Sequence, residues 1–396
     1  MARALKIAMV AACPFPYPRG TPIRIFRMAE ALSRRGHEVH VVTYHLGDPT
    51  NGADFEIHRT PNITSYRRYS PGPTYQKLFL VDPLLLVTLL RVLRRYEIDL
   101  IHAHHYEGLF VSLLARAATK HPVVYDAHTL LESELPFYRL GFHSKIRRAV
   151  GRYLDRSLPK RANHTVAVTE RIRDELVSRG GIAPEDVTFV PNGVESERFD
   201  VKPEYKKKIA NGKKVLVYAG NLAPYQRIDL LLEAFGEVLA ERRDVRLMIV
   251  SNSTFDEYEP LAIRLGIRGD IDIVPPDISA LSGYLADADV ALNPRTYCDG
   301  IPQKLLNYMA AGSPIVSFEG SAQILEHGKT GFKVEDGNTT AFSERVLQLL
   351  RDSALAGEVG ANAKRRASEY TWEKTAEKLE AAYERVLDRR NSERGR

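Results

Sequence analysis

Short apolar segments alternate with longer amphipathic stretches along almost the whole chain, and this alternation constrains the fold more than any other feature. In the first half, the apolar segments predict strands at Leu5–Ala11, Glu38–Tyr44, Asp54–Arg59, Asp99–Ala103, Val123–Asp126 and Thr165–Val168. Between them lie stretches with helical periodicity, such as Ile23–Arg35, Gln76–Arg95 and Ser144–Lys160. Strands that alternate with helices are typical of parallel sheets with helices on both faces.

A second series of the same kind begins at Lys214. Its predicted strands and helices are Val215–Ala219, Asp229–Arg242, Val245–Val250, Ile271–Val274, Val290–Asn293, Pro302–Ala310 and Ile315–Phe318. The stretch Val194–Lys214 is rich in charge and carries proline, glycine and a lysine run, which is typical of a linker. We therefore predict an α/β protein of two doubly wound parallel-sheet, Rossmann-like domains over residues 1–195 and 196–370. A C-terminal helix over 371–389 would end in a frayed tail, 390–396.

Composition places the chain among ordinary globular proteins. It has 396 residues, of which 44% are hydrophobic and 27% charged, enough for two domains with their own cores. Its two cysteines, Cys13 and Cys298, lie far apart, which disfavours a disulfide framework and fits a reducing compartment. No signal peptide is visible, and the most apolar run, Leu78–Leu93, is too short and too interrupted to span a bilayer. We predict a cytoplasmic protein.

The net charge of +6 is concentrated in the first half of the chain. One basic cluster lies within Arg91–Arg95, and a second lies within Lys145–Arg161, where Asp155 is the only acidic residue. Solvated helix faces explain most charge runs. An anionic membrane surface would explain these clusters equally well, at about 1 kcal/mol per basic residue near the headgroups, and would make the protein peripheral to the membrane. No recognisable nucleic-acid-binding module is present, so we expect no nucleic-acid partner.

The stretch from Asn293 to Gly337 carries the clearest indication of function. A strand ends at Asn293, a polar loop with Asp299 and Gly300 follows, and a helix begins at Pro302. Backbone N–H groups and the positive end of the dipole at a helix N-terminus suit a phosphate. An acidic residue on the same loop would repel that phosphate unless it faced hydroxyl groups. A ligand with phosphate on one side and hydroxyls on the other is a nucleotide sugar.

This stretch resembles the donor-site signature of the retaining glycosyltransferases of family 4. That family has two glutamates at the spacing of residues 299 and 307, and the second is followed by a small-residue turn similar to Met309–Pro314. Here Asp299 keeps the charge on a shorter arm, whereas Asn307 keeps only the hydrogen-bonding capacity. The resemblance extends over nearly the whole chain. It implies the GT-B architecture, in which two Rossmann-like domains face each other across a cleft and the last helix crosses back to the first domain.

In the first predicted domain, the resemblance points to two residues. His128 follows a predicted strand and takes the place of the family's active-site histidine, near the donor sugar, although a lone histidine is more often structural. Gly20, in Arg19–Pro22, lies where the family has a glycine-rich turn that approaches donor and acceptor. A plain tight turn explains Gly20 equally well.

In the second predicted domain, the resemblance implies a complete donor site. Asp299, as the second catalytic residue, would hold sugar hydroxyls, and Asn307 would reach the nucleotide ribose. The backbone after Gly300 would hold phosphate, and Gly220 would allow the backbone to approach the donor closely.

Two cations of the family pattern are missing from this site. In the family an arginine follows the glycine and a lysine lies about five residues further on, and both contact the diphosphate. Here these positions hold Asn221, which we keep as a donor-binding candidate, and Gln226. Losing one such electrostatic donor costs about 3–4 kcal/mol. The candidates to replace them are Lys304, as the first choice, Arg227 and Arg295.

The histidines at 102, 104 and 105 have the composition of a metal site. His102 and His104 share one face of a strand and could converge. No third carboxylate or cysteine has a recognisable spacing, however, and a catalytic zinc usually needs three protein ligands. We therefore expect no metal. The family does not need one, because cationic side chains and helix dipoles hold the diphosphate.

The function implied by the resemblance is a retaining, metal-independent hexosyltransferase without a cofactor. It would use a UDP- or GDP-sugar and a lipid-linked or saccharide acceptor, in cell-envelope or extracellular polysaccharide or glycolipid synthesis. A sugar-nucleotide epimerase of the same shape fits the Asp299–Pro314 pattern less well. A catalytically inactive binding partner is favoured by the missing cations and opposed by Asp299 and His128. A nicotinamide-dependent oxidoreductase is disfavoured because GxGxxG follows neither domain's first strand.

Overall fold

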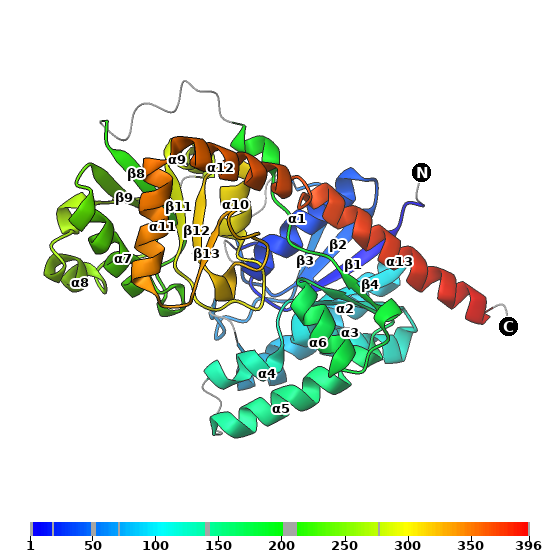
Figure 1. Cartoon of the computed structure of the whole chain (residues 1–396). Coiled ribbons are helices and arrows are strands. Elements are labelled where there is room, and N and C mark those ends of the chain that lie inside the picture. The colour runs from blue at the N-terminus through cyan, green and yellow to red at the C-terminus, as the bar shows by residue number, and fades with distance from the viewer. Residues whose placement is uncertain are drawn as a thin grey trace. The chain divides into compact units, whose positions relative to one another are not determined.

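The computed structural model describes residues 3–17, 20–48, 53–69, 72–138, 143–200, 212–275 and 278–394. Contacts divide the chain into two compact units (Figure 1). Unit 1 comprises Met1–Gly193 and Trp372–Arg396, and unit 2 comprises Val194–Thr371. Arg19 and most of the predicted linker, residues 201–211, lie outside the described residues.

Unit 1 contains a parallel sheet with the strand order β3-β2-β1-β4-β5-β6-β7. Every strand predicted for the first half forms, with ends that differ by at most about two residues, as is usual for element boundaries. The strands are β1 (Lys6–Ala11), β2 (Glu38–Thr43), β3 (Glu56–Arg59), β4 (Leu100–His104), β5 (Val123–Ala127), β6 (His164–Ala167) and β7 (Val187–Phe189).

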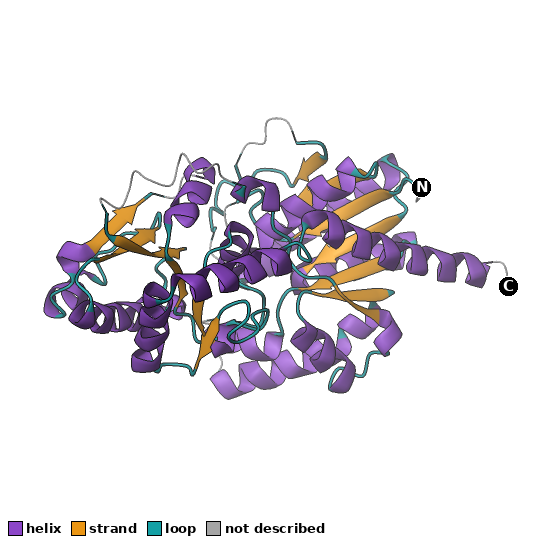
Figure 2. Cartoon of the chain, turned by 45° about the horizontal axis from the view of Figure 1, so that its top comes forward, coloured by secondary structure: helices purple, strands orange, loops and turns teal. Residues whose placement is uncertain are grey.

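Helices cover both faces of this sheet (Figure 2). They are α1 (Gly20–Arg34), α2 (Asp82–Arg95), α3 (His105–Thr119), α4 (Leu131–Glu134), α5 (Ser144–Ser157), α6 (Glu170–Ser178) and α13 (Trp372–Arg394). A π-helical turn, Lys77–Val81, leads into α2.

The last helix, α13, belongs to unit 1 although it follows unit 2 in the sequence. It lies beside α1 (Figure 1) and packs Trp372, Leu379 and Tyr383 into the core on that face of the sheet. The helix continues to Arg394, so the prediction of an irregular tail from residue 390 was wrong as far as Arg394; residues 395–396 lie outside the described part.

Unit 2 repeats the architecture with the strand order β10-β9-β8-β11-β12-β13. Its strands are β8 (Lys214–Ala219), β9 (Val245–Val250), β10 (Ile271–Val274), β11 (Val290–Asn293), β12 (Ile315–Phe318) and β13 (Phe332–Val334). Its helices are α7 (Ile228–Glu241), α8 (Glu259–Arg264), α9 (Ile278–Asp287), α10 (Gln303–Ala311), α11 (Thr339–Arg351) and α12 (Ser353–Ala367). The sequence analysis missed β13, because its three residues are too few to show a period.

Each sheet separates two hydrophobic cores. In β1, Ile7 and Met9 enter the core on the α13 side, whereas Ala8 and Val10 enter the core on the opposite side. All four are fully buried, as expected for a parallel sheet covered on both faces. Within the described residues, no helix combines the length and the apolar character required to cross a bilayer.

Both sheets have a point where the strand order reverses direction. In unit 1 this point lies between β1 and β4, and in unit 2 it lies between β8 and β11. Ligands of doubly wound sheets bind beyond the carboxyl ends of the strands at such points. The loops that follow β1, β4, β8 and β11 are therefore the places to examine for a functional site.

Candidate active site

In unit 2, Gly220 directly follows β8 at the reversal point. Its φ is 156°, and a Cβ built there would lie 3.0 Å from Tyr218 Oη and 3.3 Å from Lys304 Nζ. The backbone conformation favours glycine at this position, and a side chain would in addition have to displace the ends of the tyrosine and the lysine by a few tenths of an ångström.

Lys304 lies in the first turn of α10 and reaches back toward β8. Its Nζ donates to Gln226 Oε1 at 2.7 Å and to Tyr218 Oη at 3.1 Å, and it lies 4.2 Å from the centroid of the Tyr218 ring. Burial and the nearby Arg295 guanidinium lower the pKa of Lys304 well below its ordinary value. The half-buried amine is thus held without an anionic partner among the described residues, so an arriving anion would stabilise its charged form.

Arg295 follows β11 and extends the same group of side chains. Its guanidinium lies 4.9 Å from the centroid of the Tyr225 ring, and its Nε donates to the carbonyl of Tyr297 at 2.6 Å. The Tyr225 hydroxyl accepts a hydrogen bond from Asn221 Nδ2 at 3.0 Å. Asn221, Arg295 and Lys304 therefore lie around one loop region beyond the carboxyl ends of β8 and β11.

The loop before α10 carries Asp299 and Gly300. Tyr297 donates its hydroxyl proton to Asp299 Oδ1 at 2.6 Å, which fixes the position of that carboxylate. A Cβ added to Gly300 would meet no atom within 4 Å, so packing within the chain does not explain a glycine there. Helix α10 begins after Pro302 without a side-chain cap, and Asn307, half-buried, lies on the same face of the helix as Lys304.

Two other predicted donor residues, Arg227 and Gly20, are placed differently from the group around Lys304. Arg227 precedes α7 with a φ of 57°, and its guanidinium is paired with Asp229, its Nη2 lying 2.8 Å from Oδ2. Its charge is therefore largely neutralised within the loop, which makes Arg227 the weakest of the three replacement cations. Gly20 is the first residue of α1 in unit 1, and a Cβ there would meet no atom within 4 Å.

In unit 1, His128 follows β5 and is buried beside a carboxylate. Its Nε2 lies 3.5 Å from Asp126 Oδ2 and 3.4 Å from His104 Nδ1. Burial lowers the pKa of His128 well below its ordinary value, more than the opposing effect of Asp126 raises it. The imidazole is therefore neutral at pH 7 and can act as a hydrogen-bonding group rather than as a cation.

The charge of Asp126 is balanced by Arg24, a residue that the sequence analysis did not single out. Arg24 Nε and Nη2 bond both carboxylate oxygens at 2.9 and 3.1 Å, and Nη2 also donates to the carbonyl of Val190. Both side chains are almost fully buried. The two parallel hydrogen bonds of the guanidinium join α1 to β5, and its bond to Val190 joins α1 to the segment after β7.

The predicted convergence of His102 and His104 does occur, and a third potential ligand is present. Asp126, on the neighbouring strand β5, brings a carboxylate within reach of both rings, although no third ligand has a recognisable spacing in the sequence. Asp126 lies too far from the two histidines in the sequence for any spacing to indicate that they meet. Its oxygens are nevertheless taken by the Arg24 guanidinium, and Tyr383 Oη lies 2.7 Å from His102 Nδ1. The carboxylate that a metal would need is thus already paired with a permanent cation.

A cavity of about 770 Å³, counting the space open to solvent, lies beyond the carboxyl ends of β1 and β4 in unit 1. Its wall carries an alternating series of charges. Lys77 Nζ lies 2.9 Å from Glu107 Oε1, and the ring nitrogens of His105 lie 2.5 Å from Glu107 Oε2 and 3.4 Å from Glu134 Oε2. Although burial opposes it, the two carboxylates raise the pKa of His105 to about 10. The two positive and two negative charges cancel.

The sequence analysis missed the roles of Lys77, His105 and Glu107 in this cavity. His105 could have been found, because it follows a predicted strand, as His128 does. It also adopts a φ of 62°, and such strain in a residue with a side chain is concentrated at functional sites. Lys77 and Glu107 come from helical segments that are far apart in the sequence, and no spacing indicates that they meet.

Two family models match the chain, one on each half. Glycosyltransferase Family 4 matches residues 18–198, and Glycosyl transferases group 1 matches residues 213–352. Among curated relatives, the chain is 26% identical over 390 residues to a D-inositol 3-phosphate glycosyltransferase of Geodermatophilus obscurus, covering 92% of this chain and 84% of the relative. It is 24% identical over 414 residues to an uncharacterized glycosyltransferase of Methanocaldococcus jannaschii, covering 97% and 99%.

Solved structures with the same fold include two that cover nearly all of the chain. Sucrose-phosphate synthase from Thermosynechococcus elongatus has a TM-score of 0.80 at 18% identity, over 97% of this chain and 99% of that one. Anabaena Alr3699/HepE, in complex with UDP and glucose, has a TM-score of 0.72 at 18% identity, over 95% and 98%. The two family matches follow one another along the chain and fall on two parallel-sheet units, so the chain belongs to glycosyltransferase family 4 and is a nucleotide-sugar glycosyltransferase with the GT-B fold.

Proposed function

We propose that this enzyme transfers a hexose, with retention, from a UDP- or GDP-sugar to a hydroxyl group of a lipid-linked or saccharide acceptor. One observation carries the donor half of this proposal. Lys304 Nζ is hydrogen-bonded to the side chain of Gln226, which occupies the position of the family's missing lysine. Once an arriving phosphate favours its charged form, Lys304 would supply the positive charge that the family pattern has at position 226, although from a different helix.

The diphosphate would be held by charge and by backbone. Lys304 and Arg295 would supply two positive charges near Gly220 when the diphosphate is bound, and the N-terminus of α10, which has no side-chain cap, would present its N–H groups. Both stabilise the charge that grows on the leaving phosphate, which is the main task of a transferase of this type. These groups perform it without a metal or another cofactor. Asp299 would then hold sugar hydroxyls, and Asn307 would contact the ribose.

The acceptor would enter the cavity of unit 1. Since the charges on its wall cancel, it favours an uncharged, hydroxyl-bearing group over a free phosphate. Tyrosines contribute the apolar part of the wall, and aromatic faces pack well against sugar rings. The neutral His128 would position reacting groups, while the leaving phosphate oxygen takes the acceptor proton.

A surface of unit 1 supports a peripheral membrane location at the cytoplasmic face, which suits polysaccharide or glycolipid synthesis. Helix α5 exposes an apolar stripe, Ile146, Val150 and Tyr153, next to basic residues such as Arg148 and Arg156. A helix that presents apolar and basic groups side by side to solvent fits an anionic lipid surface.

An inactive binding partner remains the second candidate, because Asn221 and Gln226 replace the family's two cations. Thermal unfolding with UDP, GDP, ADP and TDP distinguishes an active transferase from an inactive binding partner. A nucleotide at a hundred times its dissociation constant stabilises by about 2.7 kcal/mol, which raises the unfolding midpoint by several degrees. We expect one nucleotide to do so, and we expect Lys304→Ala and Asp299→Ala to diminish the shift or the subsequent turnover.

The matched control is Arg264→Ala, which removes an exposed positive charge from α8. If no nucleotide shifts the midpoint, the donor site is lost and the inactive partner is the correct assignment. If a nucleotide binds, turnover of its sugar with and without added saccharide distinguishes a transferase from an epimerase, which would need no acceptor.

A further inference from the structure

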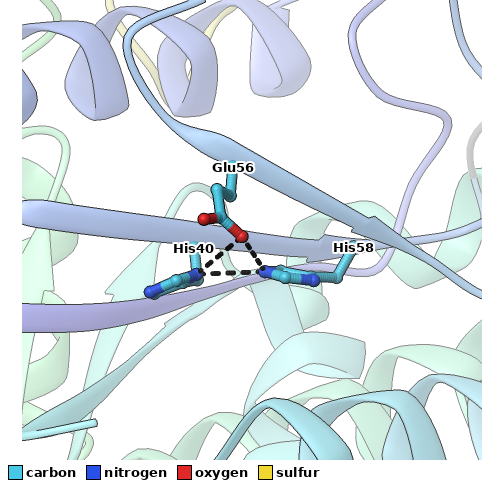
Figure 3. A group of neighbouring side chains, drawn as sticks. All are labelled: His40, Glu56 and His58. Atoms are coloured by element: carbon cyan, nitrogen blue, oxygen red, sulfur yellow. Dashed lines mark hydrogen bonds and ion pairs between the residues drawn. The ribbon is translucent and has the colours of Figure 1, made fainter. Parts of the chain in front are cut away.

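A second histidine cluster lies in unit 1, at the edge of the sheet rather than at the carboxyl ends of its strands. His40 is on β2, and Glu56 and His58 are on the edge strand β3. His40 pairs with Glu56 in the register of the two strands, and His58 lies two residues further along the same face. Figure 3 shows the three side chains pointing toward one another.

The three facing atoms form a triangle of the size that a metal requires. His40 Nδ1 lies 3.0 Å from His58 Nε2 and 3.7 Å from Glu56 Oε2, and the remaining distance, from His58 Nε2 to Glu56 Oε2, is 3.5 Å. Ligands about 2.0–2.1 Å from a tetrahedral zinc are about 3.3 Å from one another. An ion at the centre of this triangle would therefore bond all three with little movement.

The surroundings hold the two imidazoles in place. His40 Nε2 lies 2.9 Å from Glu38 Oε1, so this nitrogen donates its proton to the carboxylate and leaves the lone pair of Nδ1 facing the other two groups. Both rings also pack against Tyr96, with centroids 4.3 Å from His40 and 5.2 Å from His58. A carboxylate that orients a histidine in this way is the usual outer partner of a metal ligand.

We propose that a zinc ion binds to His40, Glu56 and His58 and so links the edge strand β3 to β2. Two imidazoles and a carboxylate suit zinc, whereas magnesium and calcium prefer oxygen ligands alone. His40 is buried and Glu56 is exposed, so the fourth position opens to solvent and takes water. The ion fixes a strand of only four residues at the edge of the sheet, where pairing on one side alone leaves it weakly held.

This cluster differs from the one around Asp126 in whether its carboxylate is already paired with a cation, and that difference decides which of the two can bind a metal. There the carboxylate is bonded on both oxygens by Arg24. Here, among the described residues, the acidic oxygen between the histidines faces no arginine or lysine at ion-pair distance.

Calorimetric titration of the untagged full-length chain with zinc chloride tests the proposal. We expect one zinc per chain and a higher unfolding midpoint with zinc. His58→Gln and Glu56→Gln, both on the partly exposed side of the cluster, should each lose most of the affinity while leaving the metal-free midpoint unchanged. Glu38→Gln, which removes the orienting carboxylate, should weaken binding about 10–100-fold.

The control is His143→Gln, which removes an exposed histidine from the start of α5. Zinc binding that is equally tight in wild type, His58→Gln and Glu56→Gln would overturn the proposal, because the ion would then lie elsewhere. Absence of measurable zinc binding by the wild-type chain would overturn it as well.

Discussion

At the scale of single residues, the unusual state of Lys304 controls what the donor site can bind. Burial and Arg295 hold its pKa well below the ordinary value in the ligand-free protein. A diphosphate beside it would favour the charged form, so the pKa rises on binding and the amine takes up a proton. Nucleotide affinity should accordingly fall as the pH rises, because fewer molecules can supply the ammonium form.

Calorimetry of nucleotide binding in buffers of different ionisation enthalpy measures this proton uptake directly. Lys304→Met should remove the buffer dependence together with at least tenfold of the affinity, about 1.4 kcal/mol. Arg264→Met, the exposed control, should change neither. Buffer-independent binding in the wild type, with full affinity in Lys304→Met, would show that the phosphates lie elsewhere.

Residue contacts also show where prediction from the sequence ends. His128 was placed correctly after β5 because strand ends are visible in the apolar pattern, and the same pattern predicted the other strands of both sheets except the three-residue β7 and β13. The partners Arg24, His104 and Asp126 come from three separate segments that meet only through the strand order β1-β4-β5 and the position of α1. Periodicity describes one element at a time, so contacts between elements stay hidden until the topology is known.

The Arg24–Asp126 pair belongs to the scale of elements, because it joins α1 to β5. Removing the guanidinium leaves a buried carboxylate without its counter-charge, which typically costs about 3–5 kcal/mol. Arg24→Met should therefore strongly destabilise unit 1, measured as faster hydrogen exchange of amides in β1 and β5. Adding Asp126→Asn should restore part of the protection.

Arg27→Met on the same helix serves as the control, because the Arg27–Glu30 pair is partly exposed and such pairs contribute about 1 kcal/mol or less. Equal exchange rates in Arg24→Met and Arg27→Met would refute a structural role for the buried pair.

Helix α12 supports α10, and two of its glycines test that contact. A Cβ on Gly360 would lie 2.2 Å from the carbonyl oxygen of Gly312 at the end of α10, whereas a Cβ on Gly357 would meet nothing within 4 Å. Gly360→Ala should destabilise the protein by about 1–3 kcal/mol through overpacking. Gly357→Ala should stabilise it by up to about 1 kcal/mol, because alanine favours the helix.

Thermal unfolding of the two variants measures both effects. Because α10 carries Lys304, Gly360→Ala should also reduce the stabilisation by nucleotide, and Gly357→Ala should not. Similar unfolding midpoints for the two variants would mean that α12 shifts readily to accommodate the added methyl group and does not fix the position of α10.

At the scale of the whole molecule, we expect the distribution of charge over the surface to determine membrane binding more than the net charge does. The net charge of +6 is modest for this length, but α5 carries basic residues beside an exposed apolar stripe. We expect the protein to bind vesicles that contain anionic lipid and to dissociate from them at high salt. We expect no binding to vesicles of neutral lipid. Flotation of protein with vesicles measures each of these outcomes.

A matched pair of double variants separates the effect of α5 from that of net charge. Arg148→Gln with Arg156→Gln removes two exposed charges from α5 and should weaken vesicle binding about thirtyfold, at about 1 kcal/mol for each basic residue. Arg243→Gln with Arg264→Gln removes the same charge from the surface of unit 2. If both variants lose binding equally, attraction is a property of the whole charge and α5 is an ordinary solvated helix. If only the α5 variant loses it, the helix is the surface that brings the acceptor cavity of unit 1 to a lipid-linked substrate.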